Sequence, residues 1–154
     1  MRTKQILLSI GAAIALSVIG AGAQAAPSTK FIGSWTLDLT GQAAGGPKSI
    51  TLVTSDAGGG KWKSAITTVG ADGKSTTSEV TYAVDGKDYP VTGDPTMDSD
   101  AFMSPDPNTL VIAEKKGGKL VDTLTAKLSA DGNTQNATTV TADGKSSVGV
   151  WKRK

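Results

Sequence analysis

Short stretches in which apolar and polar residues alternate fill most of the chain after residue 25. Thr, Val and Ser are frequent in them, and Gly, Asp or Pro interrupts them about every 8–12 residues, as in strands joined by turns. The pattern favours an all-β fold, an antiparallel up-and-down meander that closes into a barrel of about 8–10 strands. The predicted strands are 33–40, 48–55, 61–70, 75–84, 87–92, 99–105, 109–116, 119–129, 133–142 and 145–153.

The tripeptide Ala-Asp-Gly recurs at 71–73, 130–132 and 142–144. Each copy fits a three-residue hairpin loop with Gly in the left-handed conformation. Such a loop pairs even positions with even and odd with odd, so the first and last copies set the register of their hairpins. The predicted pairs are Trp62 with Tyr82, Ile66 with Ser78, Val140 with Ser146, and Thr138 with Val148. Large apolar residues are then expected to share one face, the inner one.

The segment 84–87, Val-Asp-Gly-Lys, fits a tighter turn with a two-residue loop. A loop of this length pairs odd positions with even ones, so it places Tyr82 opposite Tyr89 and Val80 opposite Val91. The change of turn type therefore keeps both tyrosines on the same face of the sheet.

A three-residue loop at 116–118 predicts that Glu114 and Asp122 share a face with a row of apolar residues. That row is Leu110, Ile112, Leu120, Leu124 and Leu128. Unpaired carboxylates inside a packed core cost several kcal/mol. Three explanations are open: a water-filled lumen, compensation by Lys152 and hydroxyl groups, or a slip in register. We favour the water-filled lumen.

Residues 1–25 have the features of a cleaved signal peptide. Arg2 and Lys4 precede an apolar run at 6–19, and Ala-Gln-Ala at 23–25 offers small residues at a cleavage site. The run is too short to span a bilayer, which takes about 18 residues or more. We therefore expect an exported protein, periplasmic or secreted, with one β-barrel domain over 26–154 and no integral membrane segment after cleavage.

Without Arg2 and Lys4, the 16 Lys and Arg residues fall to 14, which equals the 14 Asp and Glu residues. A chain without a basic surplus has no electrostatic footprint for nucleic acid, so no nucleic-acid partner is expected. The chain also has no His and no Cys. This composition excludes a His general base, a thiolate nucleophile and the commonest zinc and copper sites.

The remaining chemistry would need carboxylates or a Ser–Lys pair. Glu114 with Asp122, or Asp98 with Asp100, could form a glycosidase pair only at a defined separation, and Ser64 lies near two lysines on an ordinary strand. The acids that could attract calcium are Asp88, Asp94, Asp98, Asp100 and Asp106, but their spacing matches no calcium loop. We predict a protein that is not an enzyme and has no cofactor and no metal site.

Gly33-Ser34-Trp35 resembles the G-x-W motif of lipocalins, and "DGKDYPVTGDP", "DPNTL", "KKGGKLVDT" and "LSADGNT" follow it in order. Together these segments resemble a family of small exported bacterial proteins with a lipocalin-like or calycin-like barrel and no agreed function. The resemblance implies that Trp35 plugs one barrel end and that a basic residue of the last strand packs across it. By parity with the valines of that strand, Lys152 is the expected residue. The chain lacks the Cys pairs of secreted lipocalins and the helix-pair lid of fatty-acid-binding proteins.

Two functions follow from this interpretation. In the first, a small apolar or amphipathic molecule binds at a mouth lined by aromatic side chains. These are Trp62, Tyr82, Tyr89 and Phe102. In the alternative, the same residues fill a packed core, and the protein is a structural or interaction protein of the envelope, comparable to protease-inhibitor barrels. A lumen of about 300 Å³ or more favours the first function, and a filled interior favours the second.

Overall fold

The computed structural model describes residues 24–154, so nearly all of the predicted signal peptide at 1–25 lies outside the described residues. A short 3-10 helix, η1 (Thr29–Phe31), precedes the first strand. The strands are β1 (Gly33–Leu37), β2 (Ser49–Gly58), β3 (Lys61–Val69), β4 (Ser75–Tyr82), β5 (Asp88–Thr92), β6 (Ser99–Asp106), β7 (Thr109–Lys116), β8 (Lys119–Leu128), β9 (Thr134–Thr141) and β10 (Ser146–Arg153). Across these residues, no helix has the length and apolar character needed to cross a membrane.

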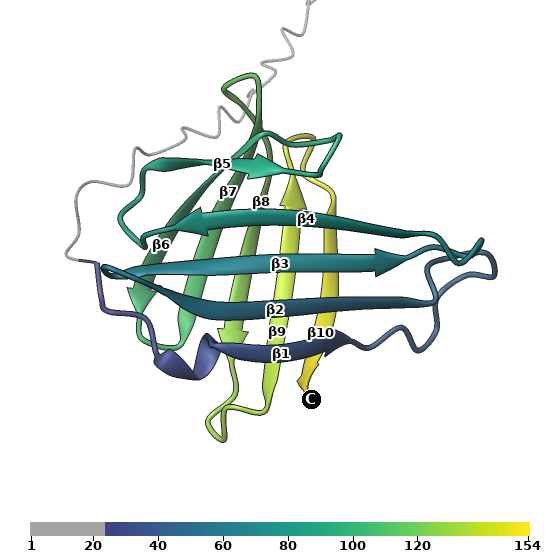
Figure 1. The fold of residues 1–154 in the computed structure, drawn as a ribbon, viewed down its shortest axis with the longest axis horizontal. Helices are drawn as coiled ribbons and strands as arrows, with labels where there is room; N and C mark the ends of the chain where they lie inside the picture. The colour runs from purple at the N-terminus through teal and green to yellow at the C-terminus, as the bar shows by residue number, and fades with distance from the viewer. Residues whose placement is uncertain (1–23) are drawn as a thin grey trace, which may run out of the picture.

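The strands form a closed antiparallel meander, which confirms the predicted fold class. Each strand pairs with its neighbours in sequence, and β1 pairs with β10 to close the barrel. In Figure 1, β2, β3 and β4 lie across the front of the barrel, while β7 to β10 run up and down behind them. Closure leaves no unpaired strand at an edge, which suits a chain rich in β-branched residues. The two layers enclose a lumen between them.

The register of the first and last Ala-Asp-Gly hairpins is confirmed. Trp62 pairs with Tyr82 and Ile66 with Ser78 across β3 and β4. The loop at 71–73 is closed by a hydrogen bond of 2.8 Å from the Gly70 amide to the Lys74 carbonyl. In the last hairpin the pairs are Val140 with Ser146 and Thr138 with Val148, also as predicted.

The middle Ala-Asp-Gly loop was predicted to have three residues, and this is wrong. Ser129 donates a hydrogen bond of 2.8 Å to the Thr134 carbonyl, so the connection comprises residues 130–133. Leu128 consequently pairs with Gln135, an even position with an odd one. A shift of one residue exchanges the two faces of a strand, so the faces of β9 and β10 are the reverse of those expected. Val148, expected inside, is 71% exposed.

The connection between β4 and β5 is also longer than predicted. Val80 pairs with Val91 as expected, but the strand ladder does not continue to Tyr82 and Tyr89. The chain instead leaves β4 after Tyr82, and the Gly86 amide donates a hydrogen bond of 2.8 Å to the Phe102 carbonyl on β6. The predicted tight turn is therefore wrong, although it gave the correct parity.

Candidate ligand-binding lumen

Trp35 closes one end of the barrel. Its side chain is fully buried at 0% exposure, and its ring nitrogen donates a hydrogen bond of 3.1 Å to the Phe31 carbonyl. It packs in an apolar cluster with Phe31, Leu110, Ala126 and Leu128. This burial in an apolar cluster is what a residue that plugs a barrel end requires.

Arg153, and not Lys152, packs across Trp35. The Arg153 guanidinium lies 4.2 Å from the centre of the Trp35 ring. Lys152 points outward and forms an ion pair of 2.7 Å with Asp38. This contact holds the pKa of the Asp38 carboxyl well below its usual range. The prediction failed because Lys152 was placed by parity with Val148, which itself faces outward.

Arg153 also explains the glycine of the G-x-W motif. Its guanidinium donates hydrogen bonds to the carbonyls of Lys30 and Ile32, and its Nε donates one to Gly132. Gly33 has φ of +142°, and a Cβ atom at this position would collide with the guanidinium. Glycine suits this position because it adopts the positive φ without strain and because it leaves room for the guanidinium. All three guanidinium nitrogens and the Trp35 ring nitrogen thus have carbonyl partners.

Three of the four predicted site residues, Trp62, Tyr82 and Phe102, contact one another, and we call them the aromatic cluster. The Tyr82 and Phe102 rings stack with centroids 3.5 Å apart, and Trp62 meets Tyr82 edge to face at 6.3 Å. The Tyr82 hydroxyl lies 3.2 Å from Ser64 Oγ, and burial raises the Tyr82 pKa to about 12. Tyr89 packs against the cluster while half-buried, and its hydroxyl donates a hydrogen bond of 3.0 Å to Asp85.

The barrel interior contains open space that borders both the aromatic cluster and the Trp35 cluster. A central cavity of about 100 Å³ is lined by Tyr82, Phe102 and aliphatic side chains of β7 and β8. A second cavity, of about 290 Å³, lies beneath the connection between β5 and β6. The two cavities share wall residues, so we treat them as one continuous lumen. The shared residues are Ser64, Ile66, Val80, Asp100 and Glu114. Trp62 also borders a separate pocket of about 300 Å³ beside Gly60 and Ala83.

Three acidic residues sit side by side on the inner wall, and we call them the carboxylate row. Asp100 on β6 pairs with Glu114 on β7, which pairs with Asp122 on β8. The placement of Glu114 and Asp122 inside is confirmed. A bulge in the β7–β8 hairpin preserves the parity that was expected from a three-residue loop. Lys152, which was considered as a compensating positive charge for these acids, pairs with Asp38 instead.

Asp100 was missed as an inner residue, because it was considered only among the acids that could attract calcium or pair with Asp98. It is only 6% exposed, and its Oδ1 has no hydrogen-bond partner among the described residues. The strand pattern of the sequence was sufficient to place Asp100 on the inner face. Phe102 was expected inside, and Asp100 lies two residues before it on the same strand, hence on the same face.

Burial and nearby negative charge raise the pKa values of two members of the carboxylate row, Asp100 and Glu114. Burial, with repulsion from Asp122 and Asp94, raises the Asp100 pKa to about 7. Burial, followed by a hydrogen bond to Asp122, raises the Glu114 pKa well above its usual range. Both carboxyl groups therefore hold their protons to higher pH than exposed acids do. Within residues 24–154, no group of three or more acidic side chains is arranged to hold a metal ion.

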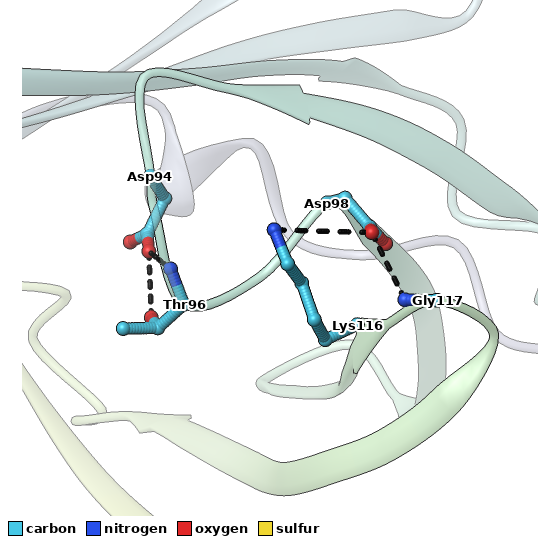
Figure 2. A network of polar contacts seen from close by, with 5 residues as sticks. All are labelled: Asp94, Thr96, Asp98, Lys116 and Gly117. Atoms are coloured by element: carbon cyan, nitrogen blue, oxygen red, sulfur yellow. Dashed lines mark hydrogen bonds and ion pairs between the residues drawn. The ribbon is translucent and has the colours of Figure 1, made fainter.

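The connection between β5 and β6 forms a rim over the larger cavity. Figure 2 shows that Asp94 accepts hydrogen bonds of 2.7 and 2.6 Å from the Thr96 amide and hydroxyl. It also shows that Asp98 accepts one of 2.9 Å from the Gly117 amide and lies 4.0 Å from the Lys116 ammonium. The rim is thereby held against the β7–β8 turn.

Ser64 and Lys63, considered as a possible Ser–Lys pair, do not come together. Ser64 faces inward and contacts Thr54 and Tyr82. Lys63 pairs with Glu79 at 3.0 Å across β3 and β4, both half-exposed. Ser64 and Lys63 therefore point to opposite sides of β3 and form no dyad.

Comparison with known proteins assigns no family. A scan against protein-family models found no match, and a search of curated proteins found none either.

Proposed function

We propose that this protein is an exported, non-enzymatic barrel of the lipocalin-like kind that binds a small amphipathic molecule in its lumen. The observation that supports this most directly is the cavity of about 290 Å³ beneath the rim. Its size is close to the lower limit for sites that enclose small ligands, about 300 Å³. The central cavity extends it toward the aromatic cluster.

The walls of the lumen match an amphipathic molecule better than a purely apolar one. Ile66, Val80 and Val91 supply apolar surface, and Asp100 and Glu114 supply polar groups on the opposite wall. Binding sites of this kind combine a mainly apolar lining with a few polar groups that fix orientation. Tyr82 and Phe102 are then the deeper wall of the site, while Tyr89 supports it from the side.

Native mass spectrometry of protein purified from its own host tests this proposal. Wild-type protein should carry a small-molecule adduct. Ser78→Phe, whose side chain fills the larger cavity, should lose the adduct. Thr81→Phe places the same side chain at an exposed position of the same strand and should keep it. Wild-type protein without an adduct, or an adduct that survives in Ser78→Phe, would contradict lumen binding.

The alternative, an envelope interaction protein, draws support from the outer surface. Val148 and Val140 are exposed on neighbouring strands, at 71% and 42%. A protein that co-purifies in stoichiometric amount and is lost in Val148→Ser, with no small molecule in the lumen, would favour this function.

Export is part of the proposal and rests on the signal-like residues 1–25. N-terminal sequencing of the protein from the periplasmic fraction and the medium should give Ala26 as the first residue. Recovery of chain that begins at Met1 from the cytoplasm alone would contradict it.

A further inference from the structure

We propose that the ligand of this lumen is a small amphipathic amine, whose ammonium group lies at the carboxylate row and whose body extends toward the aromatic cluster. The inference rests on the proposed lumen binding and names the chemical class of the ligand. Three independent features support it: an unpaired buried acid, the ion pairs that the nearby lysines form with other acids, and an unpaired donor on another part of the lumen wall.

The carboxylate row lacks a counterion. Asp100 is 6% exposed and lines both cavities, and one oxygen each of Asp100 and Asp122 is buried without a hydrogen bond among the described residues. Groups of this kind are normally satisfied in folded proteins. A cation that enters the lumen would satisfy them and relieve the repulsion within the row.

The nearest basic side chains are engaged elsewhere. Lys115, next to Glu114, reaches across the outer face to Asp88 at 2.5 Å, and Lys116 lies beside Asp98 at the rim. Among the described residues, no ion pair involves a member of the carboxylate row. The protein therefore supplies no cation of its own for this wall, and the lumen is selective for positive charge.

Gln135 supplies a polar group on another part of the wall. It is 4% exposed, lines the central cavity, and has a side-chain nitrogen without a partner among the described residues. An amide N–H that faces a cavity calls for an acceptor. The ligand would thus carry an ammonium group at one end and a hydroxyl or carbonyl oxygen at the other, with an apolar body along Ile66 and Val80.

The charges that face Asp100 set the pH dependence of binding. The acidic groups are Asp94 at the rim and Glu114 and Asp122 in the row. Tyr82 adds a neutral hydroxyl. Because the Asp100 pKa is raised to about 7, an ammonium group must displace a proton below that pH. Affinity for an amine should therefore rise between pH 5 and pH 8, and binding should release protons.

Three matched probes of equal chain length test the proposal by titration calorimetry: aminohexanol, hexanediol and hydroxyhexanoate. At pH 8 aminohexanol should bind at least tenfold more tightly than the other two, and its affinity should fall by roughly a hundredfold at pH 5. Its heat of binding should vary with the ionisation enthalpy of the buffer, which reports proton release. Asp100→Asn should lose the preference, whereas Asp88→Asn, at an exposed acid beside the same strands, should retain it.

The outcomes separate the two proposals. If hexanediol binds as well as aminohexanol, and Ser78→Phe abolishes both, lumen binding stands and the amine inference is overturned. If no probe binds in a way that Ser78→Phe abolishes, both fail. Displacement of aminohexanol by an equal concentration of calcium would identify an inorganic cation site and would also overturn the amine inference. Far-UV circular dichroism of each variant shows whether the barrel is retained.

Discussion

The Trp35–Arg153 contact and the carboxylate row both lie in the barrel interior but differ in how their polar groups are satisfied. At the Trp35 end, the ring nitrogen and the Arg153 guanidinium all donate hydrogen bonds to carbonyls. At the carboxylate row, Asp100 and Asp122 have oxygens without partners among the described residues, and the adjoining space is open. Burial alone therefore does not separate these two regions. The difference lies in whether the buried polar groups have hydrogen-bond partners.

The largest expected effect is at the packed end. Trp35→Ala removes a fully buried ring and should lower the free energy of unfolding by about 3–5 kcal/mol. Urea denaturation followed by circular dichroism measures the change. Trp62→Ala is the matched control, because Trp62 is only partly buried and should cost clearly less. Equal losses of unfolding free energy in Trp35→Ala and Trp62→Ala would contradict the conclusion that the Trp35 contact is the more tightly packed region.

The second prediction tests the residue that covers Trp35. Arg153→Ala removes the cation over the ring and three hydrogen bonds to carbonyls. We expect a loss of about 2–3 kcal/mol in the free energy of unfolding. Lys152→Ala removes only an exposed ion pair with Asp38 and should leave stability nearly unchanged. A larger loss of stability in Lys152→Ala than in Arg153→Ala would instead support the prediction from sequence that Lys152 packs across Trp35.

The third prediction concerns pH. The Asp100 pKa is raised in the folded state, from 3.8 to about 7, so the folded protein holds this proton more tightly than the unfolded chain. The resulting stability is present below about pH 4 and is lost as the pH rises through 7. We expect the free energy of unfolding to fall by roughly 2 kcal/mol between pH 5 and pH 8.

Urea denaturation at both pH values measures this dependence, and Asp100→Asn should flatten it. Asp94, Asp131 and Asp143 have lowered pKa values and therefore contribute only below this window. A wild-type protein that is equally stable at both pH values would show that the carboxylate row is compensated.

The smallest effect is expected at Tyr89, between the two regions. Tyr89→Ala should lower the free energy of unfolding by about 1 kcal/mol, because the ring is only half-buried against the aromatic cluster. Tyr89→Phe removes an exposed hydrogen bond to Asp85 and should change little. A loss in Tyr89→Ala as large as that in Trp35→Ala would place Tyr89 in the core, and a weaker affinity for aminohexanol in both variants would place it in the site.

The sequence by itself determined the ten strands, the closed meander and much of the register. Alternation with a period of two marks a strand that has one buried face, and Gly-containing turns mark its ends. Both signals lie within short segments of the sequence, so they can be recognised without knowledge of the fold. They placed Trp62 opposite Tyr82 and placed Glu114 and Asp122 inside.

Only the tertiary structure decided the faces of the last two strands and, with them, the details of the site. A loop of residues 130–133 in place of 130–132 exchanged inside for outside, so that Arg153 and Gln135 entered the interior while Lys152 and Val148 left it. The physical reason is that a strand's side-chain period is two. One residue of loop length, which depends on how both strands meet the rest of the barrel, thus reverses every later side chain.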